Sequence, residues 1–140
     1  MSVPTIYSAY DTESDKDRLT RDFEWKGLVV PAGYKTDWVT TFPWLRGLVP
    51  RYGKGNAAAL RHDYGYTNPV FQDRARIDEQ FRLDLIDCGF SPARARMYWV
   101  GVRIGGWKYW NDFRKQGLNK LLEAFPDAHK KTAKLYLYSF

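Results

Sequence analysis

The chain has 140 residues, of which 44% are hydrophobic, so it can form one domain with a sizeable core and a short appended segment. Its 22 Lys and Arg against 16 Asp and Glu give a net charge of +6, which favours anionic partners, although scattered charge of this kind is also typical of a merely soluble surface. No apolar run approaches the roughly 18 residues of a membrane span. The single cysteine, Cys88, excludes an internal disulfide. The N-terminal stretch "MSVPTIYSAYDTESDKDR" has no basic segment followed by an apolar one, so we expect synthesis in a cytoplasm without a secretory signal.

The N-terminal part is predicted to form a small β-hairpin over residues 18–36. Aromatic and apolar residues flank Lys26-Gly27, which can turn, and Pro31 indicates that the returning strand is an edge strand or is broken there. The following segment, 37–54, is punctuated by Pro and Gly. An irregular segment of this length in a small domain is more often functional than idle.

Two helices are predicted next. Asn56 is a candidate N-cap for a helix of about ten residues that ends before Asn68-Pro69. A second helix is predicted from about Asp73 to Cys88, because Gly89 then provides a stop.

A third helix is predicted to open at Ser91-Pro92, a cap followed by proline at the first helical position, and to bend at Gly105-Gly106. Residues 112–140 contain a short amphipathic piece and the alternating stretch "AKLYLYSF". The predicted fold is therefore mainly α, with a small N-terminal β-hairpin.

Apolar stripes predict how the first two helices pack. In the second helix, Asp78 heads a stripe at i, i+3, i+7 and i+10 whose other members are Phe81, Leu85 and Cys88. In the first helix, His62 shares a face with Ala59 and Tyr66. A buried carboxylate needs a partner, so we expect the helices to pack antiparallel with His62 meeting Asp78.

Such a pair has a chemical use. A carboxylate that accepts a hydrogen bond from one imidazole N–H fixes the tautomer and leaves the other nitrogen as a general base toward water. Asp63 lies about a hundred degrees round the helix from His62, so it could hold a cation together with Asp37 and loop carbonyls. Oxygen ligands of this kind suit Ca²⁺ better than Zn²⁺. The alternative is structural: a buried His-Asp pair can be a satisfied core contact, and a single His-Asp dipeptide is weak evidence of a site.

The stretch "RHDYGYTN", with "RIDEQF" and the upstream "KTDWVTTFP", resembles the bacterial and fungal branch of secreted phospholipase A₂. That branch has a His-Asp-x-x-Tyr helix, an antiparallel second helix that contributes an aspartate, and a Thr-Asp calcium loop. Residues 18–110, with "VPAGYKTD" and "AALRHDYGY", resemble even more closely a domain family of uncharacterised function in tailed bacteriophages.

The resemblance implies roles for six residues, in a fold with two antiparallel helices and a third helix. It makes His62 the general base and Asp78 its orienting carboxylate, with Tyr66 hydrogen-bonded in the same network. Its implied calcium ligands are Asp63, Asp37 and the Trp38 carbonyl, and calcium would assist ester hydrolysis. The chain departs from the branch where Val39 and Ala59 replace the two cysteines that fasten the calcium loop to the helix.

Two functions follow as expectations. The first is a bacteriophage hydrolase with a calcium-dependent, phospholipase A₂-like site that acts on host membrane phospholipid. The second is a non-enzymatic virion component, in the tail, neck or head, that uses the same scaffold for protein contacts. In either case residues 1–110 would be the phospholipase A₂-like domain and 111–140 a basic, aromatic extension that binds other virion proteins, its "AKLYLYSF" end adding as a strand. The protein would be made in the host cytoplasm and carried in the virion, and a specific nucleic-acid partner is not expected because no motif supports one.

Overall fold

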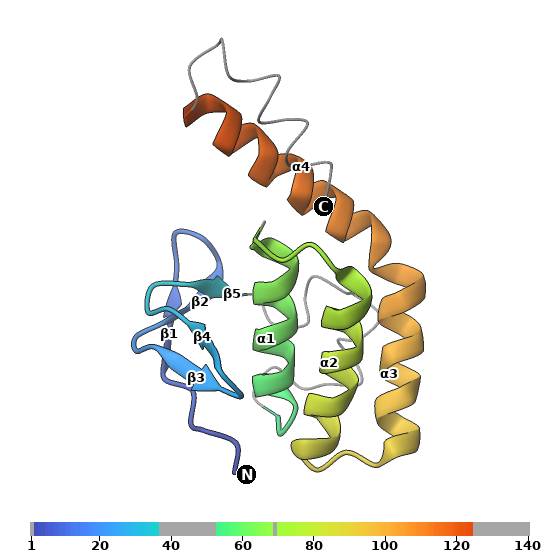
Figure 1. Ribbon diagram of the computed structural model, residues 1–140. Coiled ribbons are helices and arrows are strands. Elements are labelled where there is room, and N and C mark those ends of the chain that lie inside the picture. Colours follow the sequence, from blue (N-terminus) through green and yellow to red (C-terminus); the bar gives the residue numbers. More distant parts are fainter. Residues whose placement is uncertain (1, 37–52, 69, 125–140) are drawn as a thin grey trace.

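The computed structural model describes residues 2–36, 53–68 and 70–124, with side chains up to residue 116. A small antiparallel strand region is followed by four helices, so the fold is mixed α/β and mostly helical. In Figure 1 the strands lie on one side of α1, while α2 and α3 follow on its other side and α4 departs at an angle from the end of α3. None of the helices in the described part of the chain is long and apolar enough to cross a membrane.

The strands form two small antiparallel sheets. Three strands pair in the order β1-β2-β5, and the other two form the hairpin β3-β4. Their bounds are Ser8–Asp11 for β1, Lys16–Leu19 for β2, Phe23–Trp25 for β3, Leu28–Val30 for β4 and Lys35–Thr36 for β5.

The predicted hairpin over residues 18–36 and its turn at Lys26-Gly27 are confirmed, and the returning strand is broken after Val30, next to Pro31, so that the hairpin forms two ladders. Both turn residues have positive φ, 52° and 78°, as a two-residue hairpin turn requires. Between the two ladders the register continues: the Leu19 N–H donates to the Tyr34 carbonyl at 2.9 Å, and the Leu19 carbonyl accepts from Gly33 at 2.8 Å. The pair β3-β4 is therefore the turn end of a longer hairpin, and β2-β5 is its open end.

Three of the four helices begin close to the predicted positions, whereas the fourth was not predicted as a separate helix. Their bounds are Asn56–Thr67 for α1, Arg74–Asp87 for α2, Pro92–Gly105 for α3 and Trp107–Ala124 for α4. Asp73 and Ser91 are side-chain N-caps of α2 and α3, and Gly89, with φ of 101°, follows the end of α2. The cap position of α1 is Gly55 rather than Asn56, which is already helical, and no side chain caps this end.

Helix α1 lies between two hydrophobic clusters, and nine of its twelve residues are buried. Ala57 and Leu60 pack with strand residues, whereas Ala58, Ala59 and Tyr66 pack with α2 and α3. The strand-side cluster comprises Leu19, Phe23, Trp25, Val30, Ala57 and Leu60; the helix-side cluster includes Phe81, Leu85, Phe90, Ala95, Tyr98 and Val102. The alanines thus let both layers approach the same helix.

The bend predicted at Gly105-Gly106 separates α3 from α4. Gly106 is buried, and a Cβ atom there would lie 2.4 Å from the Val102 carbonyl oxygen and 2.5 Å from the Tyr66 hydroxyl. Beyond the bend, Arg114 of α4 donates to the carbonyls of Gly65 and Phe71, at 2.9 and 3.0 Å, and to that of Tyr66. Helix α4 therefore runs across the expected boundary at 110/111 and docks on the C-terminal end of α1. The stretch "AKLYLYSF" lies outside the described residues.

Gly106→Ala should destabilise the protein by about 1–3 kcal/mol, because the added methyl group must displace both a backbone carbonyl and the Tyr66 hydroxyl. Urea unfolding followed by circular dichroism measures the loss. In a Tyr66→Phe background the same substitution should cost less, because one of the two clashing atoms is gone. An unchanged unfolding midpoint for Gly106→Ala would show that the bend has room for a side chain.

Candidate functional site

His62 of α1 and Asp78 of α2 meet inside the helical layer. The helices run antiparallel, and His62 Nε2 lies 2.8 Å from Asp78 Oδ1. His62 is 4% exposed and Asp78 is fully buried. The approach predicted from the two apolar stripes is confirmed as geometry, and the catalytic role stays a prediction.

Asp78 is the centre of a larger network. The Tyr66 hydroxyl donates to the same Oδ1 at 2.7 Å, and Arg103 of α3 donates to Oδ2 at 2.8 Å. Arg74 Nε lies 3.7 Å from Oδ2 and donates to the Tyr66 hydroxyl at 3.1 Å. The carboxylate is thus shared by groups from three helices.

The network controls the ionisation of its members. Burial raises the pKa of the Asp78 carboxyl, but hydrogen bonds from His62, Tyr66 and Arg103 outweigh it and hold the pKa below its ordinary value of 3.8. Burial and the adjacent Asp78 charge raise the pKa of Tyr66. At neutral pH Asp78 is therefore an anion and Tyr66 a neutral hydrogen-bond donor.

Packing also fixes the imidazole ring. Its centroid lies 4.4 Å from that of the Tyr66 ring and 4.6 Å from that of Phe81. With Nε2 on Asp78 and two aromatic rings beside it, His62 is preorganised and does not rotate freely.

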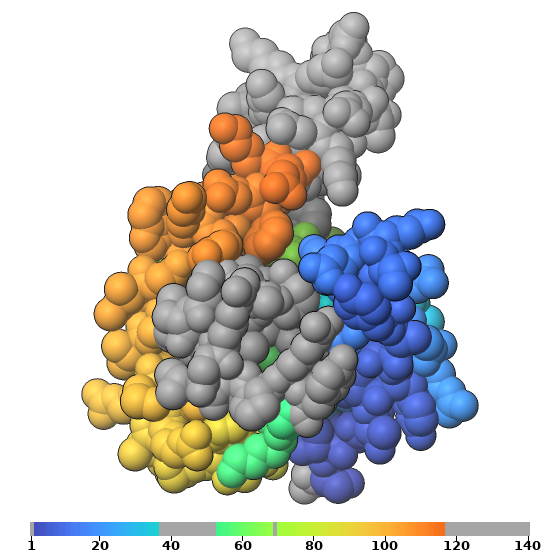
Figure 2. All heavy atoms as spheres, turned by 180° about the vertical axis from the view of Figure 1, so that it is seen from behind, coloured from blue at the N-terminus to red at the C-terminus, as the bar shows by residue number. Residues whose placement is uncertain are grey.

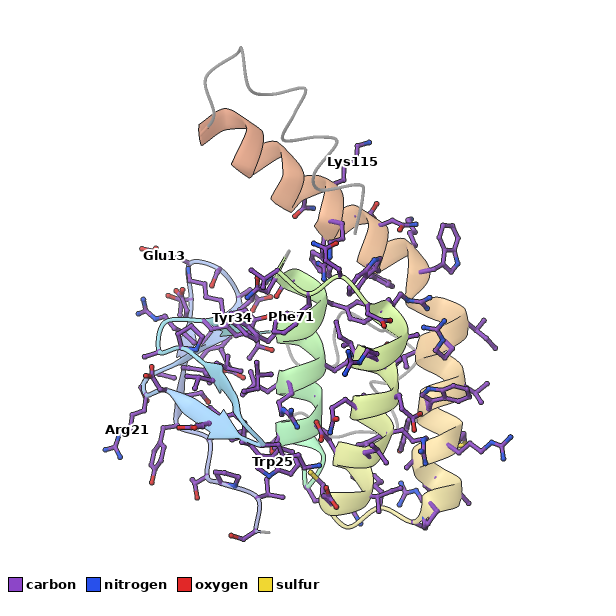
Figure 3. All side chains as sticks on the ribbon, in the orientation of Figure 1. Glu13, Arg21, Trp25, Tyr34, Phe71 and Lys115 are labelled. Atoms are coloured by element: carbon purple, nitrogen blue, oxygen red, sulfur yellow. The ribbon has the colours of Figure 1, made fainter. Side chains whose placement is uncertain are left out.

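Asp63, next to His62 in sequence, points toward the strands. It is 5% exposed, and its Oδ2 accepts hydrogen bonds from the Thr36 hydroxyl at 2.8 Å and the Tyr34 hydroxyl at 3.1 Å. Figure 3 shows Tyr34 on the strand side of α1. The other expected calcium ligands, Asp37 and Trp38, lie outside the described residues.

The fit of calcium can be judged from the described donors. Asp63, Thr36 and Tyr34 offer only oxygen atoms, which is the kind of donor that calcium takes. Calcium needs six to eight such ligands, and the described ranges contain no group of three or more His, Cys, Asp or Glu placed to hold a metal. The described donors fit calcium in kind but not in number, so a site would need residues 37 and 38.

A cavity of about 460 Å³ opens beside the His62–Asp78 pair, between α1, α2 and β4. Its lining includes His62 and a second buried charge pair, in which Arg61 Nη1 lies 2.7 Å from Asp84. Asp84 also accepts from Lys26 at 2.9 Å and Gln80 at 2.8 Å. The remaining lining residues are Leu28, Gly65, Val70, Phe71, Gln72, Asp73, Arg76, Ile77 and Phe81.

Sequence reasoning missed Arg74, Arg103 and the Arg61–Asp84 pair. Arg74 could have been found, because it precedes Asp78 by four residues on the same helix. Arg103 could not, since it comes from another helix with several arginines and only packing selects among them.

Asp78→Asn should lower the free energy of unfolding by about 3–5 kcal/mol at neutral pH, because Arg103 and His62 lose a buried anion. The pKa of Asp78 is lowered in the folded state, so its stabilisation is present above about pH 4 and is lost as the pH falls through the folded pKa. The difference between wild type and variant should therefore shrink below pH 4 in urea unfolding curves. Tyr66→Phe keeps the carboxylate but removes one of the hydrogen bonds that lower its pKa, so it should keep a pH dependence of the same sign and smaller size. A difference that stays constant down to pH 2.5 would mean that Asp78 is not the titrating group.

Comparisons with known proteins place the chain in a family without assigning it an activity. The family model described as "Protein of unknown function (DUF1353)" matches residues 15–102, which include all of α1 and α2 and most of α3. No curated protein and no solved structure matches. The match includes His62, Tyr66 and Asp78 together with the strands that hold Asp63. The chain belongs to the DUF1353 family.

Proposed function

We propose that this protein is a hydrolase of phospholipase A₂ type that cleaves the carboxylic ester of a lipid, with His62 as general base. The observation that carries the proposal is the 2.8 Å contact between His62 Nε2 and the buried, anionic Asp78. Tyr66 donates to the same carboxylate oxygen, so the three side chains to which the phospholipase A₂ resemblance gives catalytic roles share one hydrogen-bond network.

The network supports a simple proton path. Asp78 accepts a hydrogen bond from the Nε2–H, which leaves Nδ1 of His62 as the basic nitrogen. Nδ1 removes a proton from water as the water oxygen attacks the ester carbonyl carbon. The tetrahedral intermediate then expels the alcohol oxygen, which takes the proton back from His62, and an acid and an alcohol are released. Asp78 stabilises the transient imidazolium without itself being protonated.

Calcium is the cation that we propose for this site. Asp63 would hold it together with Asp37 and the Trp38 carbonyl, and the hydroxyls around Asp63 support an oxygen-rich surrounding. When bound, calcium would polarise the ester carbonyl and stabilise its developing negative charge.

A second candidate is a non-enzymatic component of a phage virion, in which the same scaffold makes protein contacts. One observation favours it: Arg103 also binds Asp78, so the carboxylate is fully satisfied by protein groups and the network can serve stability alone. In this candidate the partners are other virion proteins and residues 111–140 contribute to the contact.

His62→Gln should reduce lipid hydrolysis by at least about 100-fold, because a general base contributes roughly 10²–10⁴ in rate. The assay uses phosphatidylglycerol vesicles whose acyl chain carries a fluorophore, with fatty-acid release as the readout. Tyr64→Phe is the matched control, since Tyr64 lies on the same helix and packs against Tyr34 and Phe71 rather than Asp78. A folded wild-type protein that releases no fatty acid, or a His62→Gln variant with full activity, would favour the virion component.

Calcium binding should depend on Asp63. Titration calorimetry should show binding to wild type at micromolar to millimolar calcium and none to Asp63→Asn, because the ion loses a carboxylate ligand. Asp112→Asn removes an equal charge from an exposed position of α4 and should bind like wild type. Absence of a binding heat for wild type at 10 mM calcium would remove calcium from the proposal while leaving the His62 test intact.

A further inference from the structure

Helix α3 has an apolar face that the fold does not cover. Met97, Val100, Ile104 and Trp107, the first residue of α4, are spaced by three, four and three residues, and we call them the outer stripe. They are 51%, 40%, 71% and 58% exposed. The buried residues of α3, Ala95, Tyr98 and Val102, lie on the opposite side of the helix. The outer stripe is therefore a second apolar face rather than a frayed part of the core.

The position of α3 leaves this face accessible. In Figure 1 α3 is the outermost element of the helical layer, on the side away from the strands. In Figure 2, seen from behind, α3 and the start of α4 form a continuous yellow-to-orange edge of the molecule. A single exposed apolar residue needs no explanation, but four on one helix face do.

The charged residues of α3 and of the first turn of α4 are all cations. No Asp or Glu occurs between Gly89 and Asn111, whereas Arg94, Arg96, Arg103 and Lys108 do. Arg96 lies on the α2 side, where it lines a shallow hollow with Glu79, Arg82 and Trp99. Arg94 lies on the other side, with its guanidinium over Phe90. Cationic residues thus border both flanks of the stripe.

We infer that the outer stripe is the docking surface for an amphipathic helix of a partner protein whose apolar seam is flanked by Asp and Glu. The spacing of three, four and three is that of the a and d positions of a coiled coil, whose seam is narrower than the face a helix buries in a core or a membrane. From Met97 to Ile104 the stripe spans about 10 Å along α3, and Trp107 continues it past the bend, so the partner segment needs about three turns. Methionine, tryptophan and arginine are also the residue types enriched in protein interfaces.

Two other occupants fit less well. A second copy of this chain would bring arginine against arginine across the contact, which repels in the absence of intervening acids. An anionic bilayer would suit the charge, but it favours a broad apolar face, and this one is only one residue wide.

The surface can be tested with designed peptides. The acidic peptide is a three-heptad helix with leucine at a and d and glutamate at e and g; the basic peptide has lysine at e and g and is otherwise identical. Both carry a fluorophore, and anisotropy is measured on the full chain. The acidic peptide should bind at least roughly tenfold more tightly than the basic one. Ile104→Ser should weaken its binding by about tenfold or more, whereas Leu83→Ser, an exposed leucine on α2, should not.

A charge-reversal variant separates charge-specific recognition of the peptide from nonspecific apolar binding. Arg96→Glu should weaken binding of the acidic peptide and strengthen binding of the basic one. A variant that is unfolded, or that binds any apolar helix, would not show these opposite changes. Equal binding of both peptides, or binding of neither at 1 mM, overturns the inference. So does binding to phosphatidylglycerol vesicles without peptide binding, which would assign the stripe to lipid. A dimer in sedimentation that is lost in Ile104→Ser would assign it to self-association and overturn the inference as well.

Discussion

The Asp78 carboxylate is the constraint on which the helical half of the protein depends. An isolated buried carboxylate is too costly to retain, so the three groups that bind it directly have to stay in place. These groups, His62, Tyr66 and Arg103, come from α1 and α3, while Asp78 itself belongs to α2. One buried charge therefore ties three helices together, in addition to the apolar cluster that they share. The same contacts that fix the helices also fix the imidazole, so the catalytic role proposed for His62 needs no contacts beyond those that stabilise the fold.

Arginine side chains extend this arrangement to the helix ends. Arg74 donates to the carbonyls of Val102 and Arg103 at the end of α3, and Arg114 donates to the carbonyls of Gly65 and Tyr66 at the end of α1. The last carbonyls of a helix have no partner within it and carry partial negative charge, so a guanidinium satisfies both needs. Burial lowers the pKa of Arg114 to about 10, which still leaves it charged at neutral pH. Part of the basic excess of the sequence is thus structural and is not available to anionic partners.

The sequence predicted the helical half better than the strands for identifiable reasons. Helices α2 and α3 have strong boundary residues in Asp73 and Ser91, and the stripe through Asp78 shows which face is buried. Strand β1 was not predicted because its residues, "SAYD", are largely exposed and show no apolar alternation. In the candidate site, His62, Tyr66 and Asp78 could be predicted from spacing within two helices. Arg103 depends on how a third helix packs, which no local pattern contains.

The three consecutive alanines at the start of α1 have a consequence for how this chain can change. Ala57 contacts the strand-side cluster, while Ala58 and Ala59 contact the helix-side cluster, so the methyl groups determine the thickness of both layers at once. A larger side chain at any of the three positions would push one layer away from α1. The helix could not shift to make room, because the other layer packs against its opposite side. The exposed aromatic and aliphatic residues, by contrast, have solvent on one side and room to vary. Mutational tolerance in this protein should therefore be lowest where its side chains are smallest, the reverse of what size alone would suggest.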